Sequence, residues 1–340
     1  MSKILVILTG GTIGSCLEEK VISARVERSA EIVKRYERIY GQEHEFEVVQ
    51  PLNELSENLQ PRNWEAVIQE LDKALEKDYD GIIVTHGSDT LAYTSAFMAI
   101  RYAYVNIPVV FIAANYPLDD ERSNGMCNFA GAVTFIKEQP ATGVFTIYKN
   151  GESEADVFLP TRLLNSDPYF DQYRSFDHEV FGWIQNGKFV KNSDCPVSLE
   201  MVANRNTDIV KGLSFHYQNE ILLIPAYLGV NFRNYQCNEH TKAVLLYLYH
   251  SATGPINDEA GLPEFIERCL EAGIKVYGTS FKGRDINHYQ TTHVLLQKGL
   301  CPIFNTSEIA AYVKLVLAYN QDKVEPDTLL ENNIFFETLE

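Results

Sequence analysis

The sequence predicts an α/β protein built on a parallel sheet. The first observation is a continuous apolar run over residues 3–8, which is typical of strands covered on both faces. The second is the alternation that follows, because strand-like runs at 81–85 and 108–113 are separated by segments of helical character. Repeated strand–helix units of this kind form parallel sheets.

The segments between these strands have the marks of helices. Residues 29–40 are expected to form the first helix, followed by a strand at 46–49. Another helix begins at Pro61, since proline suits the first helical position. Apolar side chains then recur at helical spacing, at Trp64, Val67, Ile68, Leu71 and Leu75. Residues 91–104 are the next expected helix.

The alternation weakens in the middle of the chain and then resumes. Residues 150–195 hold only short β-like stretches, such as 187–190. We expect an N-terminal domain over 1–190, a linker over 191–212 and a C-terminal domain over 213–340. In the last domain the expected elements are strands at 220–226 and 243–249, a helix at 262–272, a strand at 275–280 and a helix at 307–319.

Composition excludes several classes of function. The net charge of −17 argues against nucleic acids and anionic membranes as partners, because both are polyanionic. No apolar run reaches the roughly 20 residues that span a bilayer, and the N-terminus lacks the pattern of a signal peptide, so we expect a cytoplasmic protein. The six cysteines form no CxxC pair and the eight histidines form no ligand cluster, which predicts reduced thiols and no bound metal.

Two short motifs each follow a predicted strand. Thr9–Gly14 (TGGTIG) follows the first strand, and His86–Thr90 (HGSDT) follows the strand at 81–85. Each motif alone is compatible with a tight turn or a helix N-cap. The first is neither a phosphate-binding P-loop nor a full dinucleotide fingerprint. Ligands bind at the carboxyl ends of strands in open α/β sheets, so the two motifs together indicate one active site with two candidate nucleophiles.

The paired motifs resemble those of the bacterial-type L-asparaginase family, whose members carry TGGTI near the N-terminus and HGTDT some 75–80 positions later. Ser56–Leu59 resembles the family's substrate-binding stretch, and Ser123–Gly125 resembles part of its third strand–loop region. The resemblance implies a larger N-terminal flavodoxin-like domain and a smaller C-terminal α/β domain. It also implies a homodimer or homotetramer that binds a small amino acid and needs no cofactor.

The resemblance also implies roles for individual residues. Thr12 is the expected nucleophile, and Ser88 with Asp89 takes the place of the second threonine–aspartate pair. The substrate would be held by the α-carboxylate at Ser56, by the α-ammonium at Glu57 and Asp89, and by backbone at Gly11 and Ala114.

Two expected catalytic groups are missing. The segment after the first motif contains no tyrosine, and Arg25 stands about where the family places one. No lysine occurs between Lys149 and Lys188, where the family has the lysine of its proton relay. The basic residues that could replace this lysine are Arg162 and His250, although arginine does not deprotonate in proteins.

Three functions follow from these observations. The first is hydrolysis of the side-chain amide of L-asparagine to L-aspartate and ammonia. The alternative is a catalytically degenerate homologue that binds a small amino acid. A third, an amide-supplying component of a tRNA amidotransferase, is disfavoured because that relative carries an extra N-terminal domain before its first motif, which here begins at residue 9.

Overall fold

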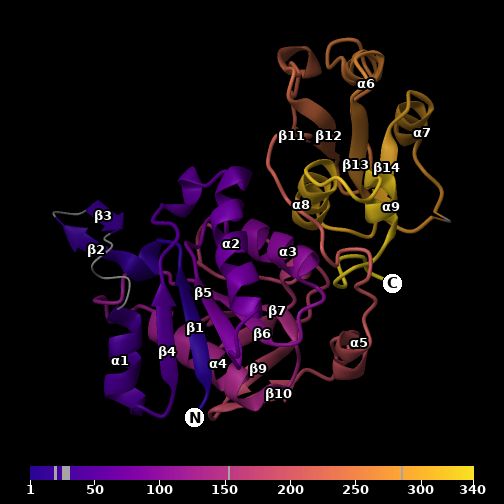
Figure 1. The fold of residues 1–340 in the computed structure, drawn as a ribbon. Helices are drawn as coiled ribbons and strands as arrows, with labels where there is room; N and C mark the ends of the chain where they lie inside the picture. Colours follow the sequence, from indigo (N-terminus) through magenta and orange to yellow (C-terminus); the bar gives the residue numbers. More distant parts are fainter. Residues whose placement is uncertain (19–20, 25–30, 152–153, 285) are drawn as a thin grey trace. The chain divides into compact units, whose positions relative to one another are not determined.

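The computed structural model describes residues 1–18, 21–24, 31–151, 154–284 and 286–340, and the chain divides into two compact units (Figure 1). The first unit contains Met1–Gly212 and Ile334–Phe336, and the second contains Leu213–Asn333 and Glu337–Glu340. Residues 191–212, which we expected to form a linker, therefore belong to the first unit.

The Arg205 side chain helps to attach this segment to the first unit. Arg205 follows the short helix α5 (Leu199–Ala203). Its guanidinium group donates hydrogen bonds to the carbonyl oxygens of Ala103, at 2.5 Å, and Val105, at 2.9 Å. These bonds fix the segment after α5 to the loop between two elements of the first unit.

The first unit is built on an eight-stranded sheet with the order β10-β9-β8-β7-β6-β5-β1-β4. Its strands are β1 (Lys3–Leu8), β4 (Glu45–Val49), β5 (Gly81–Thr85), β6 (Pro108–Ile112), β7 (Gly143–Tyr148), β8 (Asp156–Phe158), β9 (Gly182–Gln185) and β10 (Lys188–Lys191). The strands β4, β1, β5, β6 and β7 pair in parallel, whereas β8, β9 and β10 extend the sheet by antiparallel pairing. In chain order the parallel strands are arranged 2-1-3-4-5, which is the flavodoxin-like order.

Four helices of the first unit accompany this sheet, and the sequence predicts the first three of them. They are α1 (Glu31–Tyr40), α2 (Trp64–Leu75), α3 (Leu91–Arg101) and α4 (Gly125–Glu138). The first unit also contains short 3₁₀ turns at η1 (Thr12–Gly14), η3 (Ser56–Asn58), η4 (Pro61–Asn63) and η5 (Pro160–Arg162). The strand β2 (Ser15–Glu18) pairs with β3 (Val21–Ala24). The apolar stripe expected after Pro61 is present in α2, where Trp64, Val67, Ile68 and Leu71 are buried.

The helix α4 was not predicted. Its buried residues include Gly125, Asn128, Gly131 and Ala132 as well as larger apolar side chains. Small and polar residues on the packed side hide the apolar periodicity by which a surface helix is found. The expected helix over 91–104 ends earlier, at Arg101.

The second unit is a smaller α/β structure, and the predicted fold class is therefore confirmed. Its parallel sheet has the order β11 (Glu220–Pro225), β12 (Thr241–Tyr247), β13 (Lys275–Phe281) and β14 (Cys301–Phe304). Its helices are η6 (Phe232–Asn234), α6 (Leu262–Glu271), α7 (Gln290–Gln297), α8 (Glu308–Tyr319) and α9 (Pro326–Glu331). Ser307 caps α8 by accepting a hydrogen bond from the Ala310 amide, at the predicted start of that helix.

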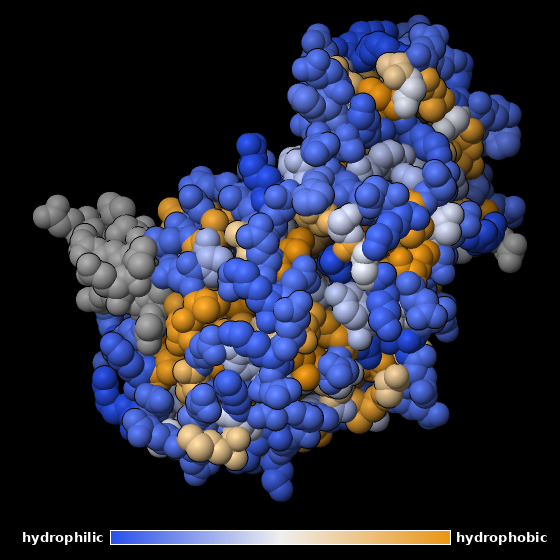
Figure 2. All heavy atoms as spheres, viewed as in Figure 1, coloured by the Kyte–Doolittle hydropathy of each residue, from blue (hydrophilic) through white to orange (hydrophobic). Residues whose placement is uncertain are grey.

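The face of the molecule drawn in Figure 2 is mostly hydrophilic. Most atoms visible in Figure 2 belong to hydrophilic residues, with apolar residues between them over both units. Among the described residues, no helix is long and apolar enough to cross a membrane.

Candidate active site

The two sequence motifs follow neighbouring strands at the point where the strand order changes direction. β4 follows β1 in the sequence and pairs on one side of it, whereas β5 comes next and pairs in parallel on the other side. The carboxyl ends of β1 and β5 therefore form the topological switch point of the sheet. The Thr9 hydroxyl donates a 2.8 Å hydrogen bond to the Thr85 carbonyl oxygen. This bond joins the start of the first motif to the residue that precedes the second.

The glycines of the two motifs lie in direct contact. A Cβ atom added to Gly11 would lie 2.5 Å from the Gly87 nitrogen, and Gly11 has a φ of +73°. A Cβ added to Gly87 would in turn lie 2.5 Å from the Ser56 hydroxyl oxygen. Only glycine fits at both positions, because real Cβ atoms do not approach other atoms so closely. The segments that carry Thr12, Ser88 and Ser56 therefore converge.

Hydrogen bonds fix the segment that carries Ser56 beside the two motifs. The Gly11 amide donates to the Glu54 carbonyl oxygen and the Glu54 amide donates to the Thr9 carbonyl oxygen, both at 3.1 Å. The Thr90 hydroxyl donates to the Ser56 carbonyl oxygen at 2.9 Å. Together these bonds attach η3 to both motifs, with the Ser56 side chain buried among them.

His86 contributes to the shape of the second motif. Its ring is buried, its Nδ1 lies 2.8 Å from the Gly87 carbonyl oxygen, and its Nε2 has no hydrogen-bond partner among the described residues. Burial lowers the pKa of His86 to about 4. A neutral ring must donate from Nδ1 to this carbonyl, and so weak a base is poorly matched to proton transfer near neutral pH.

Tyr173 is a residue of the site that the sequence analysis did not identify. Its hydroxyl donates a 2.5 Å hydrogen bond to the Ser88 carbonyl oxygen, and its ring packs edge-on against Tyr148 at 4.7 Å between centroids. Burial raises the pKa of Tyr173, with Tyr148 and Asp89 adding smaller effects in the same direction. Tyr173 follows Ser88 by 85 positions in the sequence, so no local sequence pattern indicates this contact.

Ala114 lies just after β6, beside the second motif. The His86 amide donates to the Ile112 carbonyl oxygen at 2.8 Å. The Asn128 side chain of α4 donates to the Ala113 carbonyl oxygen at 2.8 Å and accepts from the Lys149 amide at 2.7 Å. An unpredicted helix therefore fixes the ends of β6 and β7 that border the site.

The exposure of the predicted residues differs. Ser56 and Ala114 are buried, Thr12 and Ser88 are half-buried, and the carboxylates of Glu57 and Asp89 are exposed. The hydroxyl groups of Thr12 and Ser88 are partly accessible, so a small substrate can contact them. Exposed carboxylates near them can accept hydrogen bonds from a cationic group.

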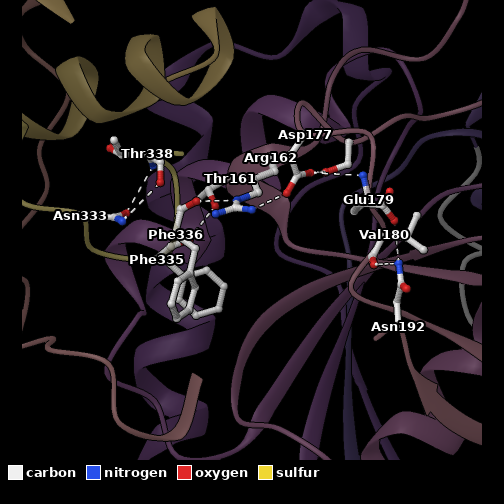
Figure 3. A network of polar contacts seen from close by, with 11 residues as sticks. Thr161, Arg162, Asp177, Glu179, Val180, Asn192, Asn333, Phe335, Phe336 and Thr338 are labelled. Carbon is white, nitrogen blue, oxygen red and sulfur yellow. Dashed lines mark hydrogen bonds and ion pairs between the residues drawn. The ribbon is translucent and has the colours of Figure 1, made fainter. Parts of the chain in front are cut away.

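Arg162 is held in a buried ion pair. Figure 3 shows its guanidinium group between Asp177 and the backbone of Phe336. It contacts the Asp177 carboxylate and donates a 2.7 Å hydrogen bond from Nε to the Phe336 carbonyl oxygen. The neighbouring Thr161 hydroxyl donates to the Phe335 carbonyl oxygen at 2.6 Å. This geometry favours anchoring of residues 334–336 over proton transfer, since arginine stays charged.

His250 is the second residue that could replace the relay lysine, and Arg25 stands about where the family places its tyrosine. His250 is exposed in the turn after β12, within the second unit. Arg25 lies outside the described residues. Within the described part of the chain, no cluster of three or more histidine, cysteine, aspartate or glutamate residues could hold a metal ion.

The fold and the convergent motifs define a flavodoxin-like α/β protein with a hydroxyl-bearing site at its switch point. The family model described as "Asparaginase, N-terminal" matches residues 3–194. The chain therefore belongs to the asparaginase family, as the two motifs predicted.

Solved structures of this family share the fold. The thermostable L-asparaginase of Thermococcus kodakarensis is similar with a TM-score of 0.78 and 21% identity, over 99% of both chains. L-asparaginase I of Vibrio cholerae is similar with a TM-score of 0.78 and 19% identity, over 100% of this chain and 99% of its own. A component of the glutamyl-tRNA(Gln) amidotransferase of Metallosphaera sedula is 24% identical over 94% of this chain and 72% of its own.

Proposed function

We propose that this protein hydrolyses the side-chain amide of L-asparagine to L-aspartate and ammonia, with Thr12 as the nucleophile. The observation that supports this most directly is the contact between Gly11 and Gly87. It brings the residues that follow these glycines, Thr12 and Ser88, to one edge of the sheet. Membership of the asparaginase family supports the same class of reaction.

In the proposed reaction the Thr12 hydroxyl oxygen attacks the carbonyl carbon of the amide. Its proton passes by way of Ser88 and Asp89 to the amide nitrogen, the C–N bond breaks, and ammonia leaves. An ester then joins Thr12 to the substrate. Water hydrolyses this ester, which gives aspartate and restores the Thr12 hydroxyl.

The substrate would be oriented by its zwitterionic end. The Ser56 hydroxyl is proposed to bind the α-carboxylate, and the exposed carboxylates of Glu57 and Asp89 are proposed to bind the α-ammonium group. Gly11 and Ala114 would face the substrate with backbone alone, which lets it approach closely.

We expect slow turnover compared with family members that have a lysine in the relay. Arg162 is engaged with Asp177 and cannot deprotonate, and the pKa of His86 is too low for a base near pH 7. A positioned general base contributes about 10²–10⁴-fold in rate, so its absence would be visible in kcat. If His250 acts as the base, its replacement by alanine removes the activity.

Hydrolysis of a glutamine amide is the second candidate. It is favoured by the similarity to components of glutamyl-tRNA(Gln) amidotransferases, which extends over nearly the whole of this chain. That similarity supports an interpretation that the sequence analysis disfavoured. A protein partner would then replace the homodimer or homotetramer expected for an asparaginase, and the mass of the particle in solution distinguishes these arrangements.

Ammonia release from purified protein tests the proposal. Asparagine should give ammonia above background and glutamine less, and Thr12→Ala should abolish release while the melting temperature stays within a few degrees. Near-native turnover of Thr12→Ala would assign the attack to another hydroxyl, and Ser88→Ala then identifies it. If neither amide is hydrolysed but asparagine raises the melting temperature, the protein is a degenerate binder of a small amino acid.

A further inference from the structure

The second unit has a cavity beside α6 that the proposed activity does not use. It has a volume of about 380 Å³ and opens to solvent. Its lining comes from η6, the connection to β12, α6 and the segment before β13: Arg233, Gln236, Cys237, Arg268, Cys269, Ala272 and Ile274. Figure 1 shows α6 beside the sheet of this unit.

Two thiols meet in this lining. The Sγ atoms of Cys237 and Cys269 lie 3.8 Å apart. A disulfide bond is about 2.0 Å long, so a shift of about 2 Å would join them. Cys269 is buried in the core of the second unit, whereas Cys237 is half-buried in the connection between η6 and β12. An external reagent therefore meets Cys237 first.

Two exposed guanidinium groups line the same cavity. Arg233 donates to the Glu259 carbonyl oxygen at 3.3 Å, and Arg268 donates to the Tyr235 carbonyl oxygen at 3.1 Å. Both partners are neutral, so the hydrogen bonds orient the arginines without cancelling their charge. In a chain with a net charge of −17, a cavity with two cations attracts anions selectively.

We propose that Cys237 and Cys269 form a reversible disulfide by exchange with a small anionic disulfide that docks on Arg233 and Arg268. Glutathione disulfide, which has a net negative charge, represents this class of reagent. The inference does not depend on the proposed amidase activity, because all of these residues lie in the second unit.

The exchange has two balanced steps. The Cys237 thiolate attacks one sulfur of glutathione disulfide, whose S–S bond breaks, and one glutathione thiolate leaves. The Cys269 thiolate then attacks the Cys237 sulfur of the mixed disulfide, and the second glutathione leaves. The cysteine pair loses two electrons, the reagent gains them, and the two thiol protons pass to the leaving thiolates.

The order of the steps follows from burial. Desolvation raises the pKa of the Cys269 thiol to about 12, with Cys237 adding to the shift. Cys269 therefore stays protonated until the mixed disulfide stands beside it. The closed disulfide would tie the connection before β12 to α6, and cross-linking of this kind raises the melting temperature.

Mass spectrometry of the reduced, full-length protein after incubation with glutathione disulfide tests the thiol pair. We expect a loss of two hydrogens and a linked peptide that joins Cys237 to Cys269. Cys269→Ser should stop at a glutathione adduct on Cys237, and Cys237→Ser should leave Cys269 unmodified. Cys301→Ser is the matched control and should react like the parent. Absence of the linked peptide, or a link to another cysteine, would overturn the proposal.

Rate measurements test the docking of the anion. In Arg233→Gln/Arg268→Gln, the reaction with glutathione disulfide should slow about tenfold, while the reaction with neutral hydroxyethyl disulfide keeps its rate. The Arg233→Lys/Arg268→Lys variant should recover most of the lost rate, because it keeps both charges. Equal slowing with both reagents, or no slowing with either, would overturn the role of the arginines.

Discussion

The Tyr173 hydroxyl donates a 2.5 Å hydrogen bond to the carbonyl oxygen of Ser88. Ser88 is the residue of the second motif that we propose to act in proton transfer, and Tyr173 reaches it from a loop 85 positions later. The Tyr173 amide in turn donates to the Asn150 side chain at 3.0 Å. The turn that carries Ser88 is thus fixed from outside its own motif.

Tyr173→Phe should therefore lower kcat more than stability. The ring would keep its packing against Tyr148, and one hydrogen bond would be lost, at about 1 kcal/mol. If Ser88 is then held less well, ammonia release falls while KM changes little. Tyr148→Phe is the control, because its hydroxyl donates at 3.1 Å to the carbonyl oxygen of Asp171 instead. Equal kcat in the two variants would limit Tyr173 to a structural role.

The sequence predicted the parts of the site that are encoded locally. Thr9–Gly14 and His86–Thr90 each contain glycine and hydroxyl residues, and each directly follows a predicted strand. The general rule for open α/β sheets then brings the two motifs together at one edge. The structure adds the reason for two of the glycines, since Gly11 and Gly87 contact each other through backbone alone.

Contacts between residues that are far apart in the sequence could not be predicted in this way. The partner of Arg162 is Asp177, its second contact is the carbonyl of Phe336, and neither pairing leaves a periodic pattern. The helix α4 was missed because small residues such as Gly131 and Ala132 face its packed side. Such features depend on which elements become neighbours, which is a property of the whole fold.

Gly11→Ala should destabilise the protein strongly. The new Cβ would lie 2.5 Å from the Gly87 nitrogen, and alanine is strained at a φ of +73°. The matched control is Gly41→Ala, where φ is +88° and no atom of the described residues lies within 4 Å of the new Cβ. That variant should lose only about 1–2 kcal/mol, from backbone strain. Urea unfolding of both variants measures the difference, and equal losses would mean that the two motifs separate at little cost.

Asp156 should make the free energy of unfolding depend on pH. Burial raises its pKa from 3.8 to about 6, and its hydrogen bond from Asn150 offsets only part of this. Because its pKa is raised in the folded state, protonation of Asp156 adds to the free energy of unfolding. This contribution is fully present below about pH 3.8 and is lost as the pH rises through 6. At about 1.4 kcal/mol per unit, the loss is about 3 kcal/mol.

Asp156→Asn should remove this dependence. The gain in unfolding free energy over the parent should grow from near zero at pH 4 to about 3 kcal/mol above pH 7. His86 acts in the opposite direction: its lowered pKa gives stability above pH 6.5 that is lost as the pH falls through about 4. The variant should therefore lose stability more steeply than the parent on acidification from pH 6 to 4. If the difference in unfolding free energy between Asp156→Asn and the parent stays constant with pH, the assignment to Asp156 is wrong.

Glu57→Gln should raise KM for asparagine more than it lowers kcat. The change removes the charge that we propose to bind the α-ammonium group, while the shape of the side chain is kept. Glu54→Gln is the control, because Glu54 is also exposed and pairs with the first motif through its backbone. An unchanged KM in Glu57→Gln, or the same rise in both variants, would remove Glu57 from the substrate pocket.

Arg162→Gln should lower the unfolding free energy by about 3–5 kcal/mol, because it leaves the buried Asp177 carboxylate without its cation. The double variant Arg162→Gln/Asp177→Asn should recover much of this loss, since both charges are then absent. Stability is measured by urea unfolding, and ammonia release is measured at a temperature where the double variant is folded. If Arg162 only anchors the chain at Phe336, the double variant keeps kcat within about threefold of the parent. A fall of about 10²-fold or more in the folded double variant would instead place Arg162 in the proton relay.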